Sequence, residues 1–385
     1  MLRYLSAGES HGPCLTAIVE GMPSNVKIDI DYINHQLKRR QGGYGRGGRM
    51  KIERDKVKVL SGLRSGKTTG APITLVIENK DWENWAPYMD AVKRPVDDSK
   101  KVTAPRPGHA DLTGVLKYHL DDVRNVLERS SARETALRVA VGALARQLLT
   151  VFGISILSHV VSIGNVSLDD SQYTLEDVAR ADDSPVRCIC PDTERKMMAA
   201  IDRARQEGDS LGGCFEVIAK GVPIGLGSHV HWDRKLDARI AAGLMSIQAI
   251  KGVEFGRGFE TTRHPGSKVH DEIYYSPDKG YYRSTNNAGG IEGGMSNGQP
   301  IIARAAMKPI PTLYRPLNTV DIVTKQPTPA GIERSDTCAV PAASVVGEGV
   351  MAWILAGELC IKFGGDSLDE MLNNYNMYNK MISSR

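Results

Sequence analysis

The sequence predicts one large α+β domain, and three observations support this prediction. Strand-like and helical patterns are mixed along all 385 residues. Their order does not alternate strand with helix, as a parallel doubly wound sheet would require. No linker, repeat or low-complexity stretch divides the chain. We therefore expect a single domain over residues 1–385, in which residues 366–385 form a peripheral C-terminal helix.

Five runs rich in β-branched and other apolar residues predict strands. They are CLTAIVEG (14–21), KIERDKVKVL (51–60), PITLVIEN (72–79), CFEVIAKGV (214–222) and PIIARAAM (300–307). The run SGLRSGKTTG (61–70) contains Gly66-Lys67-Thr68, but a phosphate-binding P-loop also needs a glycine where Ser61 stands. Because Pro72 would break the helix that must follow a P-loop, this run predicts a turn between two strands.

Apolar residues at helical spacing predict helices over residues 131–152, 193–207, 233–251, 341–363 and 367–382. Ser131 and Glu134 have the spacing of a capping box, and Gly153 would end that helix. Asp192 or Thr193 would cap the second helix, with Gly208 after its end. Residues 90–108 are rich in Lys, Asp and Pro and predict an exposed excursion.

Composition and charge exclude several classes of protein. The chain is 41% hydrophobic and 24% charged, as is usual for a globular protein, and its net charge of +4 is too small to argue for nucleic acid. The N-terminus has no signal-peptide core. The most apolar stretch, residues 339–363, carries Glu348, Glu358 and Lys362. We expect a cytoplasmic protein that binds neither membranes nor nucleic acid.

The cysteines and most histidines do not predict a metal site. Of six cysteines only Cys188 and Cys190 are close in sequence, and no second pair completes a zinc site. His229 and His231 are spaced two apart, without a carboxylate or cysteine at ligand spacing. Free thiols and no bound metal are the expectation.

The segment RRQGGYGRGGR (39–49) concentrates four arginines and five glycines. It is either a solvated basic or RNA-binding segment, or a loop that aims several guanidinium groups at one anion. RNA-binding segments of this kind usually contain stacking aromatic residues, and only 6% of this chain is aromatic. The anion-binding interpretation is therefore favoured, with Arg39 left as the arginine that could face solvent.

Other segments carry groups suited to acid–base chemistry or anion binding. His11 and His109 lie in glycine- or proline-rich turns, where a histidine is either structural or free to meet a ligand and titrate near neutrality. Arg129, Ser131 and Arg133 open the predicted helix 131–152, a position suited either to capping or to anion binding. KPIPT (308–312) is a stiff loop with one cation, and ERSD (333–336) precedes the last apolar helix.

Seven stretches together resemble the signature segments of chorismate synthase, in the same order along the chain. They are GESHGPCLTAIVEGMP (8–23), RRQGGYGRGGRM (39–50), RPGHAD (106–111), ERSSARETALRVAVGAL (128–144), GGIEGGMSNG (289–298), KPIPTLY (308–314) and RSDTCAVPAASVVGEGV (334–350). The resemblance runs from residue 1 to about residue 365. Residues from about 85 to 105 resemble the longer form found in some bacterial members.

The resemblance implies a lyase of the shikimate pathway and of aromatic amino acid biosynthesis. The family converts 5-enolpyruvylshikimate 3-phosphate to chorismate and phosphate by an anti 1,4-elimination. It requires reduced FMN, without net redox change. Members are homotetramers in which helices lie between two antiparallel sheets. Some reduce their flavin with NADPH and others use an external reductant, and this sequence leaves both open.

The same resemblance implies roles for individual residues. His11 would protonate the departing phosphate, and His109 would lie beside the reduced flavin and set its protonation. Asp336, together with flavin N5, would help to remove the ring proton. The positions that match flavin contacts are Arg129, Ser130, Ser131, Gln248, Ala249, Gly293, Lys308, Pro309, Ile310, Pro311, Thr312 and Arg334. Many members have Asn where this chain has Gln248.

The substrate's charge explains why arginines are concentrated in these segments. It carries one phosphate and two carboxylates, and FMN adds a second phosphate, so the site must supply paired cations. Arginine binds such groups bidentately and stays charged. The candidate substrate-binding residues are Ser10, Arg40, Arg46, Arg49, Arg106 and Arg334. The alternative is a flavin-dependent NADPH oxidoreductase, but no G-x-G-x-x-G follows a strand.

Overall fold

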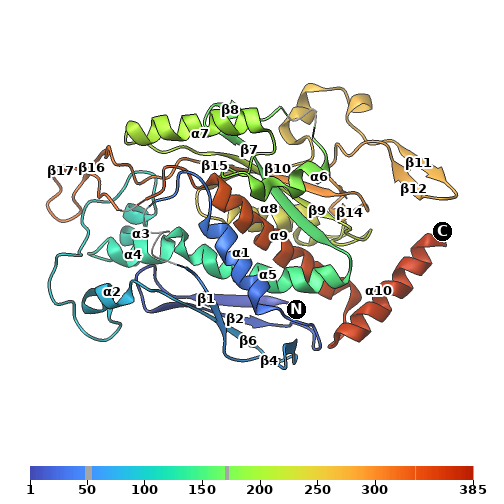
Figure 1. Ribbon diagram of the computed structural model, residues 1–385, viewed down its shortest axis with the longest axis horizontal. Helices are drawn as coiled ribbons and strands as arrows, with labels where there is room; N and C mark the ends of the chain where they lie inside the picture. The colour runs from blue at the N-terminus through green and yellow to red at the C-terminus, as the bar shows by residue number, and fades with distance from the viewer. Residues whose placement is uncertain (48–53, 170–172, 334, 385) are drawn as a thin grey trace.

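Two antiparallel sheets with helices between them form the body of the protein (Figure 1). The computed structural model describes residues 1–47, 54–169, 173–333 and 335–384. The first sheet has the order β1 (Arg3–Ala7), β2 (Cys14–Glu20), β6 (Ile73–Glu78) and β3 (Val57–Val59). The second has the order β10 (Ile250–Phe255), β15 (Ile301–Met307), β9 (Gly213–Lys220), β7 (Ser155–Ile163) and β8 (Val166–Ser167). The expected α+β class and its layered arrangement are confirmed.

Three helices fill the space between the sheets: α1 (Ile30–Gln41), α5 (Thr135–Val151) and α9 (Val340–Phe363). Helix α5 packs against β2 and β6 of the first sheet, and α9 packs against β7 and β9 of the second. Helix α8 (Leu236–Met245) packs on α9, and α7 (Pro191–Gln206) packs along the β7–β8 edge of the second sheet. Buried residues of both sheets and these helices form one continuous hydrophobic core.

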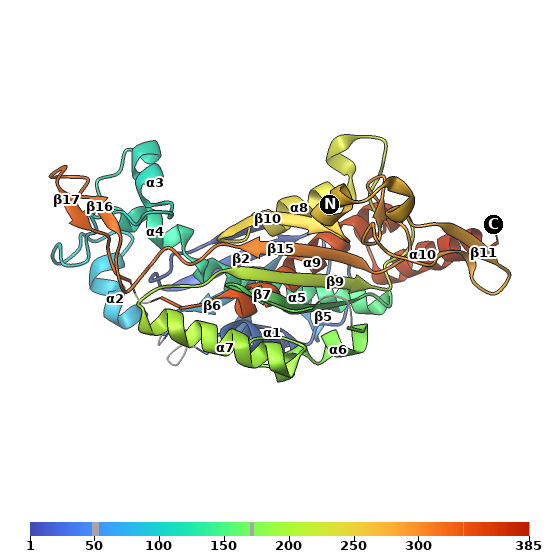
Figure 2. The same ribbon diagram turned by 90° about the horizontal axis from the view of Figure 1, so that it is seen from above.

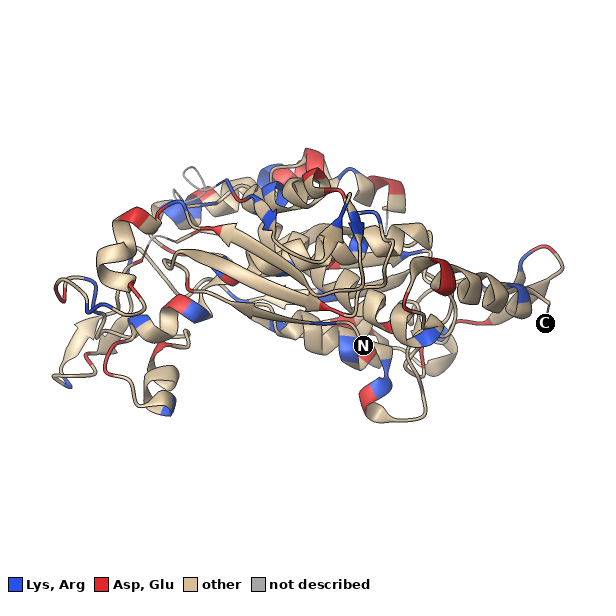
Figure 3. Cartoon of the chain, turned by 90° about the horizontal axis from the view of Figure 1, so that it is seen from below, with Lys and Arg blue, Asp and Glu red and all other residues tan. Residues whose placement is uncertain are grey.

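Smaller elements extend the body at two opposite ends (Figure 2). One end carries α2 (Trp82–Met89), α3 (Asp111–Tyr118), α4 (Arg124–Ser130) and the pair β16 (Asn318–Val320) and β17 (Pro327–Pro329). The other end carries the hairpin of β11 (Ile273–Ser276) and β12 (Gly280–Arg283), and α10 (Leu368–Ser383). Basic and acidic residues are interspersed over the chain (Figure 3).

Helices α5 and α9 cross at two glycines. A Cβ atom built on Gly142 would lie 2.3 Å from the Cα atom of Gly349, so no side chain fits between the two backbones. This close approach places Glu348 at the centre of the helical layer, where it is fully buried.

Glu348 is neutralised by three arginines from different parts of the chain. Its carboxylate accepts hydrogen bonds from Arg39 (2.5 Å), Arg146 (2.6 Å) and Arg187 (3.1 Å), and from the Ser158 hydroxyl (2.7 Å). Burial alone would raise the pKa of this carboxyl, but the arginines outweigh burial and hold the pKa well below its usual range. The cluster ties α1, α5, α9 and β7 together. Arg39 therefore does not face solvent, contrary to the sequence-based alternative.

Most predicted elements are found close to their predicted bounds. Strands β2, β6, β9 and β15 match four predicted runs, and α5, α7, α9 and α10 match four predicted helices. Of the run 51–60, only Val57–Val59 forms a strand, and residues 51–53 lie outside the described part of the chain. The run 61–70 connects β3 to β6, as predicted, and itself contains a short hairpin of β4 (Leu63–Arg64) and β5 (Lys67–Thr68).

The predicted helix over 233–251 is wrong beyond residue 245. Helix α8 ends at Met245, and β10 begins at Ile250. Ala249, between them, has a φ of 68°, a left-handed conformation that favours glycine or asparagine. The sequence therefore offers no signal for this break.

One predicted helix cap is confirmed only in part and another is wrong, whereas both glycine stops are confirmed. Ser131 caps the short 3-10 turn that leads into α5, but no capping box forms. The Ser131 hydroxyl accepts from the Arg133 amide, but the Glu134 carboxylate accepts from Arg138 (2.9 Å) instead of closing a capping box. Cys190, rather than Asp192 or Thr193, precedes α7. Gly153 and Gly208 follow their helices with φ values of 74° and 70°.

The crossing of α5 and α9 predicts an unusual response to alanine. Replacing a helical glycine by alanine normally stabilises a helix by up to about 1 kcal/mol. Gly142→Ala should instead destabilise the protein by about 1–3 kcal/mol, because the new methyl group meets backbone that cannot move aside. Urea unfolding at fixed protein concentration measures the difference.

Gly357→Ala in α9 is the matched control. A Cβ atom at this position would meet nothing within 4 Å, so this variant should be as stable as the wild type or slightly more stable. Equal stability of the two alanine variants would contradict the proposed close crossing.

Candidate active site

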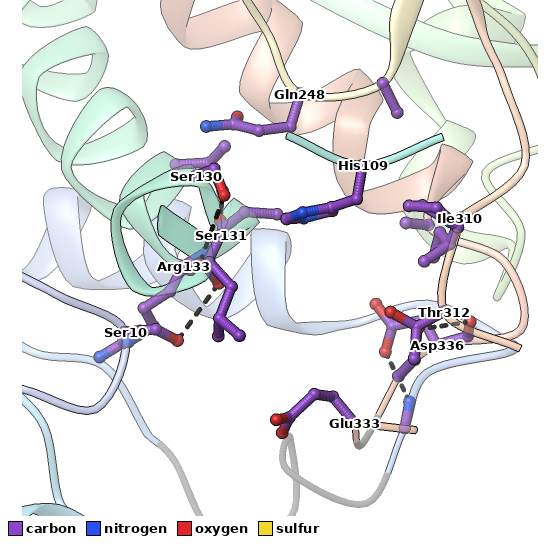
Figure 4. Close-up of a pocket in the computed structure, with 18 of the residues that line it drawn as sticks. Ser10, His109, Ser130, Ser131, Arg133, Gln248, Ile310, Thr312, Glu333 and Asp336 are labelled. Carbon is purple, nitrogen blue, oxygen red and sulfur yellow. Dashed lines mark hydrogen bonds between the residues drawn. The ribbon is translucent and has the colours of Figure 1, made fainter. Parts of the chain in front are cut away.

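A cavity of about 1180 Å³ opens where the two sheets, α4 and the loops before α9 meet. Ser10, Ser131 and Arg133 lie on one side of it, and Ile310, Thr312 and Asp336 lie on the other (Figure 4). The cavity is lined by these predicted site residues: Ser10, His11, Arg40, Arg46, Arg106, His109, Ser130, Ser131, Gln248, Ala249, Lys308, Ile310, Pro311, Thr312 and Asp336. Segments as far apart in sequence as Ser10 and Asp336 thus converge on one space.

Five predicted site residues are not among those described as lining the cavity. The Arg129 guanidinium donates to the carbonyl oxygens of Ser6 (2.9 Å) and Gly8 (3.2 Å). Gly293 lies in the turn between β13 (Ile291–Glu292) and β14 (Met295–Ser296). Pro309 is likewise not among the residues described as lining the cavity. Arg49 and Arg334 lie outside the described residues.

His11 is held at one edge and on one face. Its Nδ1 atom lies 2.8 Å from Oε1 of Glu128, and its backbone amide donates to Oε2 of the same carboxylate (2.7 Å). The Trp85 indole stacks on the imidazole, with ring centres 3.9 Å apart and an interplanar angle of 24°. Arg124 also donates to Glu128 (3.1 Å).

Glu128 is ionised despite being buried. Burial would raise the pKa of its carboxyl, but hydrogen bonding and charge from His11, and then the charge of Arg124, outweigh burial and lower the pKa. A buried carboxylate at Nδ1 directs the opposite ring nitrogen, Nε2, away from Glu128. Because His11 lines the cavity, this arrangement suits a histidine that exchanges a proton with a bound ligand.

His109 has the same kind of support from a nearer carboxylate. Its Nδ1 atom lies 2.5 Å from Oδ1 of Asp111, and Arg106 donates to Oδ2 of Asp111 from Nε (2.8 Å). Burial would raise the pKa of the Asp111 carboxyl, but hydrogen bonds from His109 and Arg106 hold it well below its usual range. Arg106 also donates to the Thr312 hydroxyl (2.9 Å), which links this loop to residues 308–312.

Asp336 anchors the arginine- and glycine-rich loop. Its Oδ2 atom accepts from Arg46 (2.6 Å), and its Oδ1 atom accepts from the Gly47 amide (2.6 Å). A Cβ atom on Gly47 would lie 2.6 Å from the Ser335 carbonyl oxygen, so only glycine allows this contact. The glycine-rich sequence therefore folds closely around the segment before α9.

Two arginines beneath the cavity share the buried Asp55. Arg40 donates to this carboxylate at 2.8 Å, and Arg133 donates to it at 2.7 Å. Burial would raise the pKa of Asp55, but the charges of Arg40 and Arg133 outweigh it and lower the pKa. Two buried cations thus share one anion, which leaves positive charge available to a ligand.

Hydroxyl and amide groups line the side of the cavity near α4. The Ser131 hydroxyl donates to the Ser10 hydroxyl at 3.2 Å. Oε1 of Gln248 is buried and has no hydrogen-bond partner among the described residues. The Ala249 carbonyl accepts from the Lys308 amide (2.9 Å), and burial, followed by repulsion from Lys251, lowers the pKa of the Lys308 ammonium group. These groups can bind a polar ligand.

The supporting residues Glu128, Asp111, Arg124, Trp85 and Asp55 were not predicted as site residues. Asp111 and Glu128 carried a usable signal, because they stand in the signature segments 106–111 and 128–144, close to His109 and Arg129. The other three are brought to the site by packing. Within the described residues, no group of three His, Cys, Asp or Glu side chains could hold a metal ion.

Comparisons with known proteins agree on one family. A family model described as chorismate synthase matches residues 2–360. Chorismate synthase of Alkaliphilus metalliredigens is 61% identical over 98% of this chain and 99% of its own length, and that of Caldicellulosiruptor bescii is 60% identical over 98% and 100%. A crystal structure of chorismate synthase has a TM-score of 0.81 at 44% identity and covers 100% of this chain and 99% of that one.

The buried Asp111 carboxylate predicts a pH-dependent loss of stability. Its folded-state pKa is depressed, so its contribution is present above the unfolded-state pKa of about 3.9 and is lost as pH falls through the folded-state value. Asp111→Asn should lower the free energy of unfolding by about 3–5 kcal/mol at pH 7, because Arg106 and His109 lose their partner. The deficit should shrink as pH falls below about 4.

Urea unfolding of both proteins at pH 7 and at about pH 3 measures this change. Asp121→Asn is the control, because Asp121 is an exposed carboxylate 3.7 Å from Lys101. Its effect should stay within about 1 kcal/mol. A deficit for Asp111→Asn that is equally large at both pH values would contradict the ionised pair.

Proposed function

Because the chain belongs to the chorismate synthase family, a family of carbon–oxygen lyases, we propose that it converts 5-enolpyruvylshikimate 3-phosphate to chorismate and phosphate by an anti 1,4-elimination. A C–H bond and the C–O bond to phosphate break, and a new C=C bond forms. The observation that carries this proposal is a single cavity with two carboxylate-backed histidines and several arginines. That combination suits a substrate with three anionic groups whose leaving group needs a proton.

The arginines would bind the substrate's phosphate and carboxylates. Arg40, Arg46 and Arg106 line the cavity, and each is already oriented by a carboxylate within 2.8 Å. Oriented cations need little rearrangement when an anion binds, which favours affinity. Ser10 adds a hydroxyl on the same wall. Arg49 and Arg334 are proposed as further substrate-binding residues on family likeness alone.

The cavity also has room for reduced FMN beside the substrate. Its volume of about 1180 Å³ exceeds the roughly 300–1,000 Å³ typical of a site for one small ligand. The buried, unsatisfied Oε1 of Gln248 marks a place for a ligand donor. Ser130, Ser131, Gln248, Ala249, Lys308 and residues 310–312 would hold the flavin. When bound, reduced FMN would supply the electron-rich partner that the elimination requires, without net redox change.

The protein's own groups would handle the two protons. His11, whose Nδ1 is fixed by Glu128, would donate a proton from Nε2 to the departing phosphate. Asp336 would help to accept the ring proton, since each of its oxygens keeps a second lone pair beyond the bonds to Arg46 and Gly47. His109, oriented by Asp111, would face the flavin and set its protonation.

The remaining expectations are part of the same proposal. Family likeness supports a homotetramer and leaves either NADPH or an external donor as the flavin's reductant. Helix α9 is long and apolar enough to cross a membrane, but 72% of its most apolar window is buried inside the fold, as in the core helix of a soluble protein. This burial supports a soluble protein, and a cytoplasmic location is proposed on family likeness.

Activity should depend on reduced FMN that is not consumed stoichiometrically. The test is anaerobic incubation of the protein with 5-enolpyruvylshikimate 3-phosphate and dithionite-reduced FMN, with chorismate followed by its absorbance. Many product molecules should form for each flavin, and oxidised FMN should give none. Full turnover with no flavin present would contradict the proposal.

The two histidines should separate kinetically. His11→Ala should lower turnover by about 10²–10⁴-fold, the usual effect of losing an acid–base group, with flavin affinity little changed. His109→Ala should instead shift the titration of bound reduced flavin, recorded spectroscopically across pH with substrate present.

His231→Ala is the matched control for these variants. Its ring lies 2.7 Å from Asp233, with the same two-residue spacing as His109 and Asp111, but the pair is exposed at the surface. This variant should behave as wild type in both measurements. A flavin shift found only in the His11 variant would reverse the two assignments.

A further inference from the structure

Helix α2 covers part of the cavity without belonging to the hydrophobic core. None of the residues of α2 is buried, and the helix lies in the segment that leads to the exposed residues 91–99. Asp81, Asn84 and Trp85 nevertheless line the cavity, together with Lys100 from the same excursion. The segment therefore contributes side chains to the site while contributing little to the packing of the body.

Trp85 is the side chain through which α2 reaches His11. Its indole stacks on the imidazole at 3.9 Å, and its Nε1 donates to Asp81 (3.2 Å), which orients the indole from within the same segment. The Arg124 guanidinium and the Lys100 ammonium group lie 5.0 and 5.2 Å from the indole centre. Cations at this range are attracted to an indole face, so three contacts hold the indole in place.

The contacts of His11 show why a stacked ring matters. The bond from Nδ1 to Glu128 fixes one point of the imidazole. A tilt of the ring plane would move Nε2 relative to a bound ligand. The near-parallel indole, at 24° to the imidazole, packs against the face of the ring and opposes such a tilt. Edge and face contacts together define one orientation, and displacements of about 1 Å can cost about 100-fold in rate.

We propose that Trp85 is a positioning residue for the proton transfer, acting through His11 by fixing the plane of its ring. This inference rests on the proposed function, in which His11 protonates the departing phosphate. Trp85 itself exchanges no proton. Its effect should therefore appear in the rate of the chemical step rather than in the binding of substrate or flavin.

The kinetic test compares two replacements of the indole. Trp85→Leu keeps an apolar side chain but removes the flat face, and should lower kcat about 10–100-fold with KM changed by less than about threefold. Trp85→Phe keeps a flat face and should recover most of kcat. Trp82→Leu, one turn away on the same helix and outside the cavity wall, should match the wild type.

Three outcomes would overturn the proposal. A raised KM with unchanged kcat would make Trp85 part of the substrate-binding wall. Wild-type kinetics in Trp85→Leu would show that the stacking is dispensable. Loss of cooperative thermal unfolding in Trp85→Leu would show that the residue is structural. Trp85→Phe would then decide the question, because a Phe variant that folds but does not recover kcat would overturn the proposal.

A second measurement does not depend on any activity. In protein labelled with ¹³C at histidine Cε1, the His11 signal, assigned by its loss in His11→Ala, should carry a ring-current shift from the indole. Trp85→Leu should remove that shift, and Trp82→Leu should leave it in place. An unchanged His11 signal in Trp85→Leu would overturn the stacking. Absence of chorismate formation by the wild type, with the shift present, would instead count against the proposed function.

Discussion

Carboxylates, most of them buried, hold cations in place, and this is the interaction on which the candidate site depends. Glu128 holds His11, Asp111 holds His109 and Arg106, Asp336 holds Arg46, and Asp55 is shared by Arg40 and Arg133. Charges cannot be taken out of water unless they are paired and hydrogen-bonded. Each carboxylate therefore makes it possible for a cation or imidazole to stand at the cavity wall in a fixed orientation before any ligand arrives.

Such an arrangement suits catalysis on a highly charged substrate. Groups that are already oriented need not reorganise as charge moves during a reaction, which is the main source of electrostatic stabilisation in enzymes. The carboxylates also limit mutual repulsion among the arginines while no anion is bound. An anionic ligand would then add interactions with an existing arrangement rather than create one.

The layered fold gives these pairs their fixed positions. Helices α5 and α9 cross at Gly142 and Gly349, which brings both sheets close enough for a continuous core. The Glu348 cluster joins α1, α5, α9 and β7 at the same level. Helix α1 carries both Arg39, which enters that cluster, and Arg40, which reaches Asp55 under the cavity. The internal charge cluster and the site are thus built on the same helix.

The sequence by itself determined much of this description. The apolar runs determined strands β2, β6, β9 and β15 and the core helices α5 and α9, because periodicity reports which residues face a core. Helix α1 and strands β1, β7 and β10 were not predicted. The segments around His11, His109 and Asp336 indicated the family, and 15 predicted site residues line one cavity. Asp111 could also have been predicted as a site residue, because it lies only two residues from His109.

Only the tertiary structure decided which partner each charged group has. Glu128 is 117 residues from His11, and Asp336 is 290 residues from Arg46. No local pattern encodes such pairs, because they arise where separately folded helices and loops meet. The same reason applies to the end of α8 at Met245, four residues before the left-handed Ala249. It applies also to Trp85, which reads as a surface residue on an exposed helix until α2 is placed over His11. Periodicity reports whether a side chain is buried, whereas packing alone decides what it is buried against.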